Sequence, residues 1–106
     1  MAADWAADVR KYVANPDEDA IAGLLKSYRL VMSSADSRYV ALSDADERDT
    51  VKKNFLTKKL GLADADGSFD AALDEVAAAM KADRTKSRIT VYYLLAEAFG
   101  KLDAVK

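Results

Sequence analysis

The 106-residue chain contains no cysteine and no histidine, and it has only one proline, Pro16, and four glycines. Without cysteine the chain can form no disulfide framework, offer no thiolate nucleophile and build no zinc knuckle. Without histidine it has no imidazole base and no common transition-metal site. The composition therefore excludes serine triads, cysteine proteases and histidine-ligated metal enzymes, but it leaves carboxylate and lysine chemistry open.

The sequence also lacks a large excess of either charge and a long run of apolar residues. The chain has 16 basic and 18 acidic residues, a formal net charge of −2, so charge alone indicates neither a nucleic-acid nor a membrane partner. No stretch approaches the roughly 18 apolar residues of a membrane span. The start, Met1 to Trp5, carries an acid where a signal peptide has a base. We expect a cytoplasmic protein that does not enter a membrane.

Alanine and aspartate dominate what is present: alanine occurs 21 times and aspartate 14 times, against 4 glutamates. Alanine has the highest helix propensity, and aspartate is a good N-cap and turn residue but a poor residue inside a helix. The length fits one domain with one core. The sequence therefore predicts an all-α fold, a single compact domain over residues 1–106 with about five short helices.

Hydrophobic periodicity predicts helices over about residues 3–13, 16–32, 43–60, 68–81 and 86–99. Asn15 is the predicted N-cap of the second helix, with Pro16 in its first helical position. Ser43 is the predicted N-cap of the third helix, and Gly61 is its predicted C-cap. The stretch 33–42 stays open between a short extended segment and one helical turn.

The last predicted helix is apolar around most of its circumference, a pattern typical of a helix that packs on two or more sides. We expect it to lie at the centre of the fold, with Tyr92 and Phe99 in the core. Its narrow polar strip consists of Thr90, Glu97 and Lys101.

One basic run is a candidate site for an anionic ligand or a nucleic acid. It consists of Lys81, Arg84, Lys86 and Arg88. Cations next to aromatic residues can bind phosphates and stacked bases, and two tyrosines follow the run. The alternative is a solvated loop in which Asp83 or Thr85 caps the next helix. Lys52 and Lys59 would join the patch if the third and fifth helices were neighbours.

Two single residues break the pattern of the last helix. Arg88 points toward the apolar side together with Tyr92, so its guanidinium either reaches past the edge of the core or forms a partly buried ion pair with an aspartate. Leu94 is an apolar residue in the polar strip. It is either an ordinary exposed leucine or the centre of a contact with a partner protein.

A calcium loop is suggested by four spaced oxygen ligands, Asp64, Asp66, Ser68 and Glu75. The match fails at the sixth position, where an EF-hand needs glycine and this chain has Phe69. We therefore expect an aspartate-rich turn that caps the next helix, with no bound metal.

No phosphate-binding glycine loop and no pair of nucleophile and base can be named. Asp70 and Asp74 stand one turn apart at a helix start, where carboxylates favourably face the helix dipole. We expect no catalytic residues, no cofactor and no enzyme activity.

Three segments resemble a known family. They are Asp4 to Tyr12 (DWAADVRKY), Asn54 to Leu62 (NFLTKKLGL) and Lys81 to Leu102 (KADRTKSRITVYYLLAEAFGKL). They resemble a small bacterial family of helical proteins with a domain of unknown function, and the last segment is the most specific. The resemblance implies a small, all-helical, cytoplasmic protein, and it carries no established activity, cofactor or functional residue.

These observations favour a small cytoplasmic protein–protein interaction or regulatory module without catalytic activity. Its partner would be another protein or a second copy of the chain. The alternative is a weak binder of nucleic acid or of an anionic ligand through the basic run.

Overall fold

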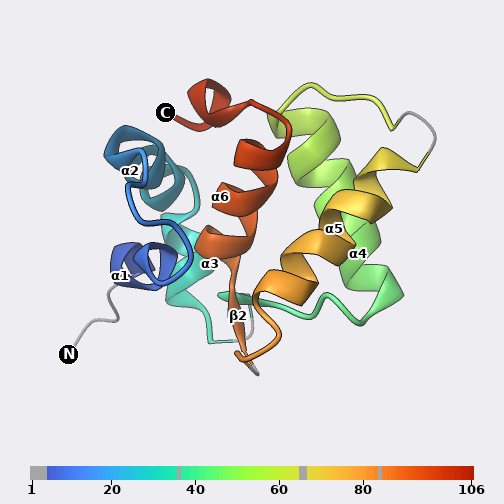
Figure 1. Cartoon of the computed structure of the whole chain (residues 1–106), viewed down its shortest axis with the longest axis horizontal. Coiled ribbons are helices and arrows are strands. Elements are labelled where there is room, and N and C mark those ends of the chain that lie inside the picture. The colour runs from blue at the N-terminus through green and yellow to red at the C-terminus, as the bar shows by residue number, and fades with distance from the viewer. Residues whose placement is uncertain (1–4, 36, 65–66, 84) are drawn as a thin grey trace.

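Helix α6, Arg88–Ala98, runs through the middle of the molecule, with α1 and α2 on one side of it and α4 and α5 on the other (Figure 1). The structure is a computed structural model that describes residues 5–35, 37–64, 67–83 and 85–106. Its other elements are α1 (Trp5–Arg10), α2 (Glu18–Ser27), α3 (Arg29–Ser33), β1 (Tyr39–Val40), α4 (Ala45–Val51), the π-helix η1 (Lys52–Lys59), α5 (Ser68–Ala79), β2 (Lys86–Ser87) and the 3₁₀-helix η2 (Leu102–Val105).

The all-α fold class is confirmed, because the only sheet in the described part of the chain pairs two strands of two residues each. The radius of gyration is 12.6 Å, close to the value of about 13 Å for a compact domain of this length. Within the described residues, no helix combines the length and the apolar character needed to cross a membrane.

The central position predicted for the last helix is also confirmed. The first six residues of α6 are all buried, and α1, α2, α5 and η2 all contact the helix. Tyr92 is a core residue with 3% of its surface exposed. Phe99 is half-buried and packs edge-to-face on Phe69, with ring centroids 5.8 Å apart.

The predicted N-cap of the second helix is wrong. Asp17, not Asn15, caps α2, because its side chain accepts hydrogen bonds from the backbone N–H groups of Asp19 (3.1 Å) and Ala20 (3.3 Å). A long-range contact fixes this start: the Asp17 N–H donates to the hydroxyl of Tyr93 at 2.8 Å. The chain is thereby bonded to α6 just before α2 begins, and Pro16 lies outside α2.

Within the open stretch 33–42, Ser33 is the last residue of α3, and Tyr39 and Val40 are extended. Tyr39 and Val40 make up β1, which pairs antiparallel with β2 so that Tyr39 lies opposite Ser87 and Val40 opposite Lys86. Its partner strand is distant in sequence, which is why local periodicity did not decide the conformation.

The third predicted helix is divided into α4 and η1. Its N-cap is Asp44, whose side chain accepts from the N–H of Asp46 at 2.9 Å, so the assignment of this cap to Ser43 is wrong. Gly61 does end the helical segment, with a positive φ of 68°, a conformation that glycine adopts without steric cost.

The spacing of the apolar residues in and next to η1 explains why this segment is a π-helix. Val51 and Leu56 are five residues apart, as are Phe55 and Leu60, and all four are buried. An α-helix would spread these side chains over half of its circumference. A π-helix bonds residues five apart, as the Leu60 N–H does to the Phe55 carbonyl at 2.9 Å. It therefore brings all four side chains to one face.

Candidate functional site

The described members of the basic run lie in different surroundings. Lys81 is exposed after the end of α5, and Arg84 lies outside the described residues. The ammonium group of Lys86 donates to the backbone carbonyl of Asp83 at 2.9 Å. Arg88 has only 8% of its surface exposed, so its guanidinium is not available to an external polyanion.

Arg88 matches neither of the two arrangements expected for it. Its Nε donates to the carbonyl of Ser37 at 2.7 Å, and its Nη1 donates to the hydroxyl of Tyr92 at 2.7 Å. No carboxylate in the described part of the chain forms an ion pair with it. The buried guanidinium therefore joins α6 to the segment before β1 through neutral oxygens.

An aromatic cluster surrounds this arginine. Tyr92 stacks on Phe55 with ring centroids 3.9 Å apart, and Tyr28 meets Tyr92 edge-to-face at 5.0 Å. Burial raises the pKa of Tyr28 to about 12, and it also raises the pKa of Tyr92. Phe55 and Tyr92 are buried and Tyr28 packs against the core, so the cluster is part of the core rather than a stacking platform for bases.

The loop before β2 is anchored to the turn that follows α1. The Asp83 carboxylate accepts hydrogen bonds from the hydroxyl of Tyr12 and, at 3.2 Å, from the ammonium of Lys11. Neither Asp83 nor Thr85 caps α6, whose first N–H, that of Arg88, donates to the carbonyl of Arg38 at 2.8 Å. The alternative prediction was a solvated loop in which Asp83 or Thr85 caps the last helix. Its helix cap is wrong.

Thr90 lies in the interior and not in a polar surface strip. Its side chain is fully buried, and its hydroxyl donates to the carboxylate of Asp8 in α1. Helix α1 thus covers part of the strip that was expected to be polar and exposed.

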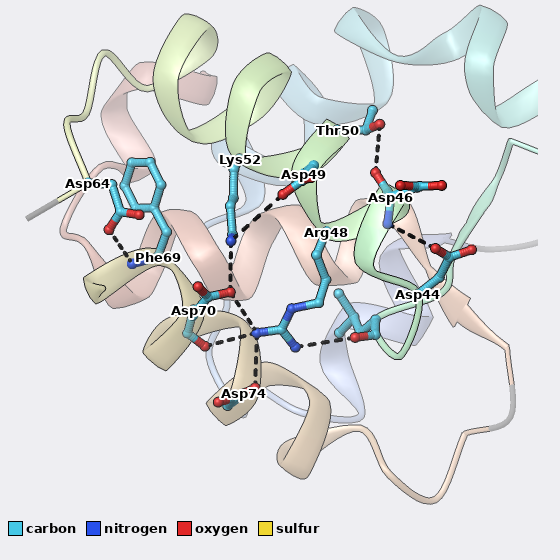
Figure 2. Close-up of polar contacts among 11 residues, drawn as sticks. Asp44, Asp46, Arg48, Asp49, Thr50, Lys52, Asp64, Phe69, Asp70 and Asp74 are labelled. Atoms are coloured by element: carbon cyan, nitrogen blue, oxygen red, sulfur yellow. Dashed lines mark hydrogen bonds and ion pairs between the residues drawn. The ribbon is translucent and has the colours of Figure 1, made fainter. Parts of the chain in front are cut away.

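The lysines of η1 do not extend the basic run. Lys52 pairs with Asp70 of α5 at 2.8 Å, and Lys59 is exposed. Arg48 of α4 reaches to the same helix, as Figure 2 shows, and pairs with Asp70 at 3.1 Å and Asp74 at 3.0 Å. These contacts neutralise Lys52 within the molecule and hold α4 and η1 against α5.

The same network uses the two carboxylates that stand one turn apart. The hydrogen bonds from Lys52 and then Arg48 lower the pKa of Asp70. A general acid at neutral pH needs a raised carboxyl pKa, so the arrangement at Asp70 opposes such a role.

The aspartate-rich turn before α5 contains a helix cap, as expected. Asp64 accepts a hydrogen bond from the backbone N–H of Phe69 at 3.2 Å (Figure 2). Phe69 is buried in the core. Asp66, another of the four ligands in the calcium pattern, lies outside the described residues.

Leu94 lines a groove between α5 and α6. The groove has a volume of about 220 Å³ and is lined by Glu75, Val76, Ala79, Leu94, Glu97 and Ala98. Leu94 is half-buried there, whereas Glu75 and Glu97 are exposed. Neither glutamate forms an ion pair with a described residue. The groove therefore combines an apolar lining with two uncompensated carboxylates.

Leu30 on α3 is the largest exposed apolar side chain, with 81% of its surface accessible. Arg29, next to it, and Lys26 at the end of α2 are also exposed. This surface carries the opposite charge to the groove.

The comparison with known families adds one finding. The model of a family described as "Protein of unknown function (DUF2853)" matches residues 4–103. The chain belongs to this family. The DUF2853 match covers the three segments on which the resemblance was recognised in the sequence. None of the curated proteins compared with the chain matches it. Membership in DUF2853 therefore supports the recognition and adds no activity, partner or site residue.

Sequence reasoning missed Leu30 for a local reason. The apolar stripe of the second predicted helix continues through Val31 and Met32. Periodicity therefore predicts a single helix over residues 16–32. The helix is interrupted at Tyr28, where φ is −112° and ψ is 20°. Met32 remains buried after this break, while Leu30 faces outward. The absence of any acid between Asp19 and Asp36 was a signal that this surface is basic.

Proposed function

We propose that this DUF2853 protein is a non-catalytic protein–protein interaction module, and that its docking surface is the groove between α5 and α6. The observation that carries the proposal is the composition of that groove. Val76, Ala79 and Leu94 supply apolar surface, and Glu75 and Glu97 stand exposed beside it. We place the module in the cytoplasm, in line with the expectation from the sequence.

The chemistry of the groove specifies the partner. A docked segment would place an apolar side chain in the groove and set lysine or arginine side chains against the two glutamates. An amphipathic helix with basic flanks meets both requirements. Complementary charge of this kind increases the association rate and excludes acidic competitors.

A matched set of variants tests the proposal. The tagged protein is used to capture partners from its own cells, in parallel as wild type, as Leu94→Lys and as Leu30→Lys, followed by mass spectrometry. A partner other than the chain itself should be captured by the wild type and by Leu30→Lys, but not by Leu94→Lys. Both variants introduce the same cation in place of a leucine, one at the exposed Leu30 and one at the half-buried Leu94.

Direct mapping completes the test. Adding the captured partner to the labelled protein should shift the backbone amide signals of residues 75–79 and 94–98. If capture of every partner other than the chain itself survives both Leu94→Lys and the Glu75→Lys, Glu97→Lys double variant, those partners do not bind in the groove, and the proposal is wrong.

The nucleic-acid alternative ranks second. It rests on the basic run, in which Arg88 is buried and Lys86 is bonded to the Asp83 carbonyl. Among the described members of the run only Lys81 is then left exposed, which favours the groove over the basic run.

A further inference from the structure

Leu30 has the properties of a side chain that inserts into a partner. It is exposed on α3, and the neighbouring Met32 is buried and holds the helix to the core. Burying an apolar side chain away from water is favourable, and Leu30 has no such burial within its own molecule.

The surface around Leu30 is positively charged. Arg29 and Lys26 are exposed, and neither forms an ion pair with a described carboxylate. No acidic residue occurs in the sequence between Asp19 and Asp36. An apolar side chain with basic neighbours is the chemistry that the groove at Leu94 requires.

The groove is complementary to this surface in size and charge. A closed cavity of roughly 150 Å³ accommodates a benzene molecule, so the groove of about 220 Å³ has room for a leucine side chain. Glu75 and Glu97 would lie opposite the cations that flank Leu30.

We propose that a second copy of this chain is a partner of the groove: Leu30 of one molecule inserts beside Leu94 of the next, with Arg29 and Lys26 facing Glu75 and Glu97. This inference rests on the proposed function and specifies which molecule binds in the groove. A symmetric contact of two grooves is disfavoured, because it would place Glu75 and Glu97 of one molecule against the same glutamates of its neighbour.

The contact is head-to-tail. The inserted side chain belongs to α3, which follows α2 on one side of α6, whereas α5 lies on the opposite side (Figure 1). Each molecule therefore offers a donor surface and an acceptor groove at different places. Such heterologous contacts generate rings or open chains. One leucine and two ion pairs make a small interface, so association should be weak and should depend on concentration.

The test measures the average molar mass by sedimentation from micromolar to millimolar concentrations. The wild type should grow in mass with concentration, and less so at high salt. Leu30→Lys and Leu94→Lys should each stay monomeric. When the two variants are mixed in equal amounts, they should form a one-to-one complex, because one retains the groove and the other retains Leu30.

Several outcomes would overturn the inference. These are a wild type that stays monomeric throughout, association that persists in either variant, and variants that fail to associate when mixed. Because Leu94 is half-buried, the Glu75→Lys, Glu97→Lys variant provides a second acceptor-defective protein with changes at exposed positions only. Circular dichroism verifies that each variant is folded. A monomeric wild type that captures a foreign partner through Leu94 would contradict self-association and leave the proposed function intact.

Discussion

Gly23 of α2 lies directly against the backbone of Val105. A Cβ atom on Gly23 would be 1.9 Å from the Val105 carbonyl oxygen and 2.7 Å from the Cα of Lys106. The missing side chain therefore makes room for the C-terminal segment, whose Val105 side chain is fully buried. The Lys106 ammonium completes the attachment by pairing with Asp17 at 3.1 Å and Asp103 at 2.9 Å.

Replacing Gly23 by alanine should destabilise the protein. At an ordinary helix position this change stabilises by roughly 0.5–1 kcal/mol. Here the added methyl group would collide with backbone atoms that cannot rotate away, and overpacking of this kind costs about 1–3 kcal/mol. Urea denaturation of the wild type and of Gly23→Ala measures the difference.

A truncation provides the control. In a chain that ends at Lys101 the obstructing backbone is gone, and Gly23→Ala should then be stabilising. The same destabilisation in the full-length and truncated chains would show that the collision with Val105 is not its cause.

Tyr92 should be a sensitive aromatic residue of α6. Tyr92→Ala removes a ring that stacks on Phe55 and a hydroxyl that accepts from Arg88, and such truncations in a core cost on the order of 3 kcal/mol. Tyr92→Phe leaves one N–H of the buried Arg88 unpaired and should cost about 1–3 kcal/mol. Thermal unfolding measures both, with Phe99→Ala at a half-buried site as the milder comparison. An unchanged melting temperature in Tyr92→Ala would contradict the central role of α6.

Sequence reasoning succeeded where local signals and tertiary structure agree. Helix α5 has a regular apolar stripe in which Phe69, Leu73, Val76 and Met80 are all buried, so an α-helical period was enough to locate it. Helix α6 was recognised as central because apolar residues cover almost its whole circumference, and burial follows from that composition.

It failed where contacts distant in sequence decide the local structure. A hydrogen bond to Tyr93 fixes the start of α2, and pairing with β2 keeps Tyr39 and Val40 extended. A hydrogen bond to Asp8 of α1 accompanies the burial of Thr90. The π-helix was missed for a different reason. An α-helical period was assumed over residues 43–60, although the five-residue spacing of Val51 and Leu56 was visible in the sequence.

The stability of the protein should fall as the pH rises from about 10 to about 12. Burial, and then the hydrogen bond to Asp83, raises the pKa of Tyr12 to about 12, and burial raises that of Tyr28 to about 12. An unfolded tyrosine titrates near 10, so the folded state holds the proton more tightly over this interval. The contribution is fully present below pH 10 and is lost as the pH approaches the folded value.

Urea denaturation at closely spaced alkaline pH values checks this dependence. The Tyr12→Phe, Tyr28→Phe double variant should show a smaller loss of stability over the same interval, because it lacks both titrating hydroxyls. An alkaline loss of equal size in the double variant would assign the effect to other groups.

We expect no nucleic-acid binding at an ionic strength of about 0.15 M. Within the basic run, Arg88 is buried and Lys86 is bonded to the Asp83 carbonyl, and Lys52 of η1 is paired with Asp70. Non-specific affinity depends on the number of phosphates that are neutralised, and it falls steeply with salt when that number is large.

Fluorescence anisotropy with single- and double-stranded oligonucleotides over a range of salt concentrations measures the affinity and its salt dependence. An Arg84→Gln, Lys86→Gln variant reports on the basic run, and a Lys53→Gln, Lys58→Gln variant removes the same charge from η1 as a matched control. Submicromolar binding near physiological salt that is lost only in the first variant would reverse the ranking and make the basic run the functional site.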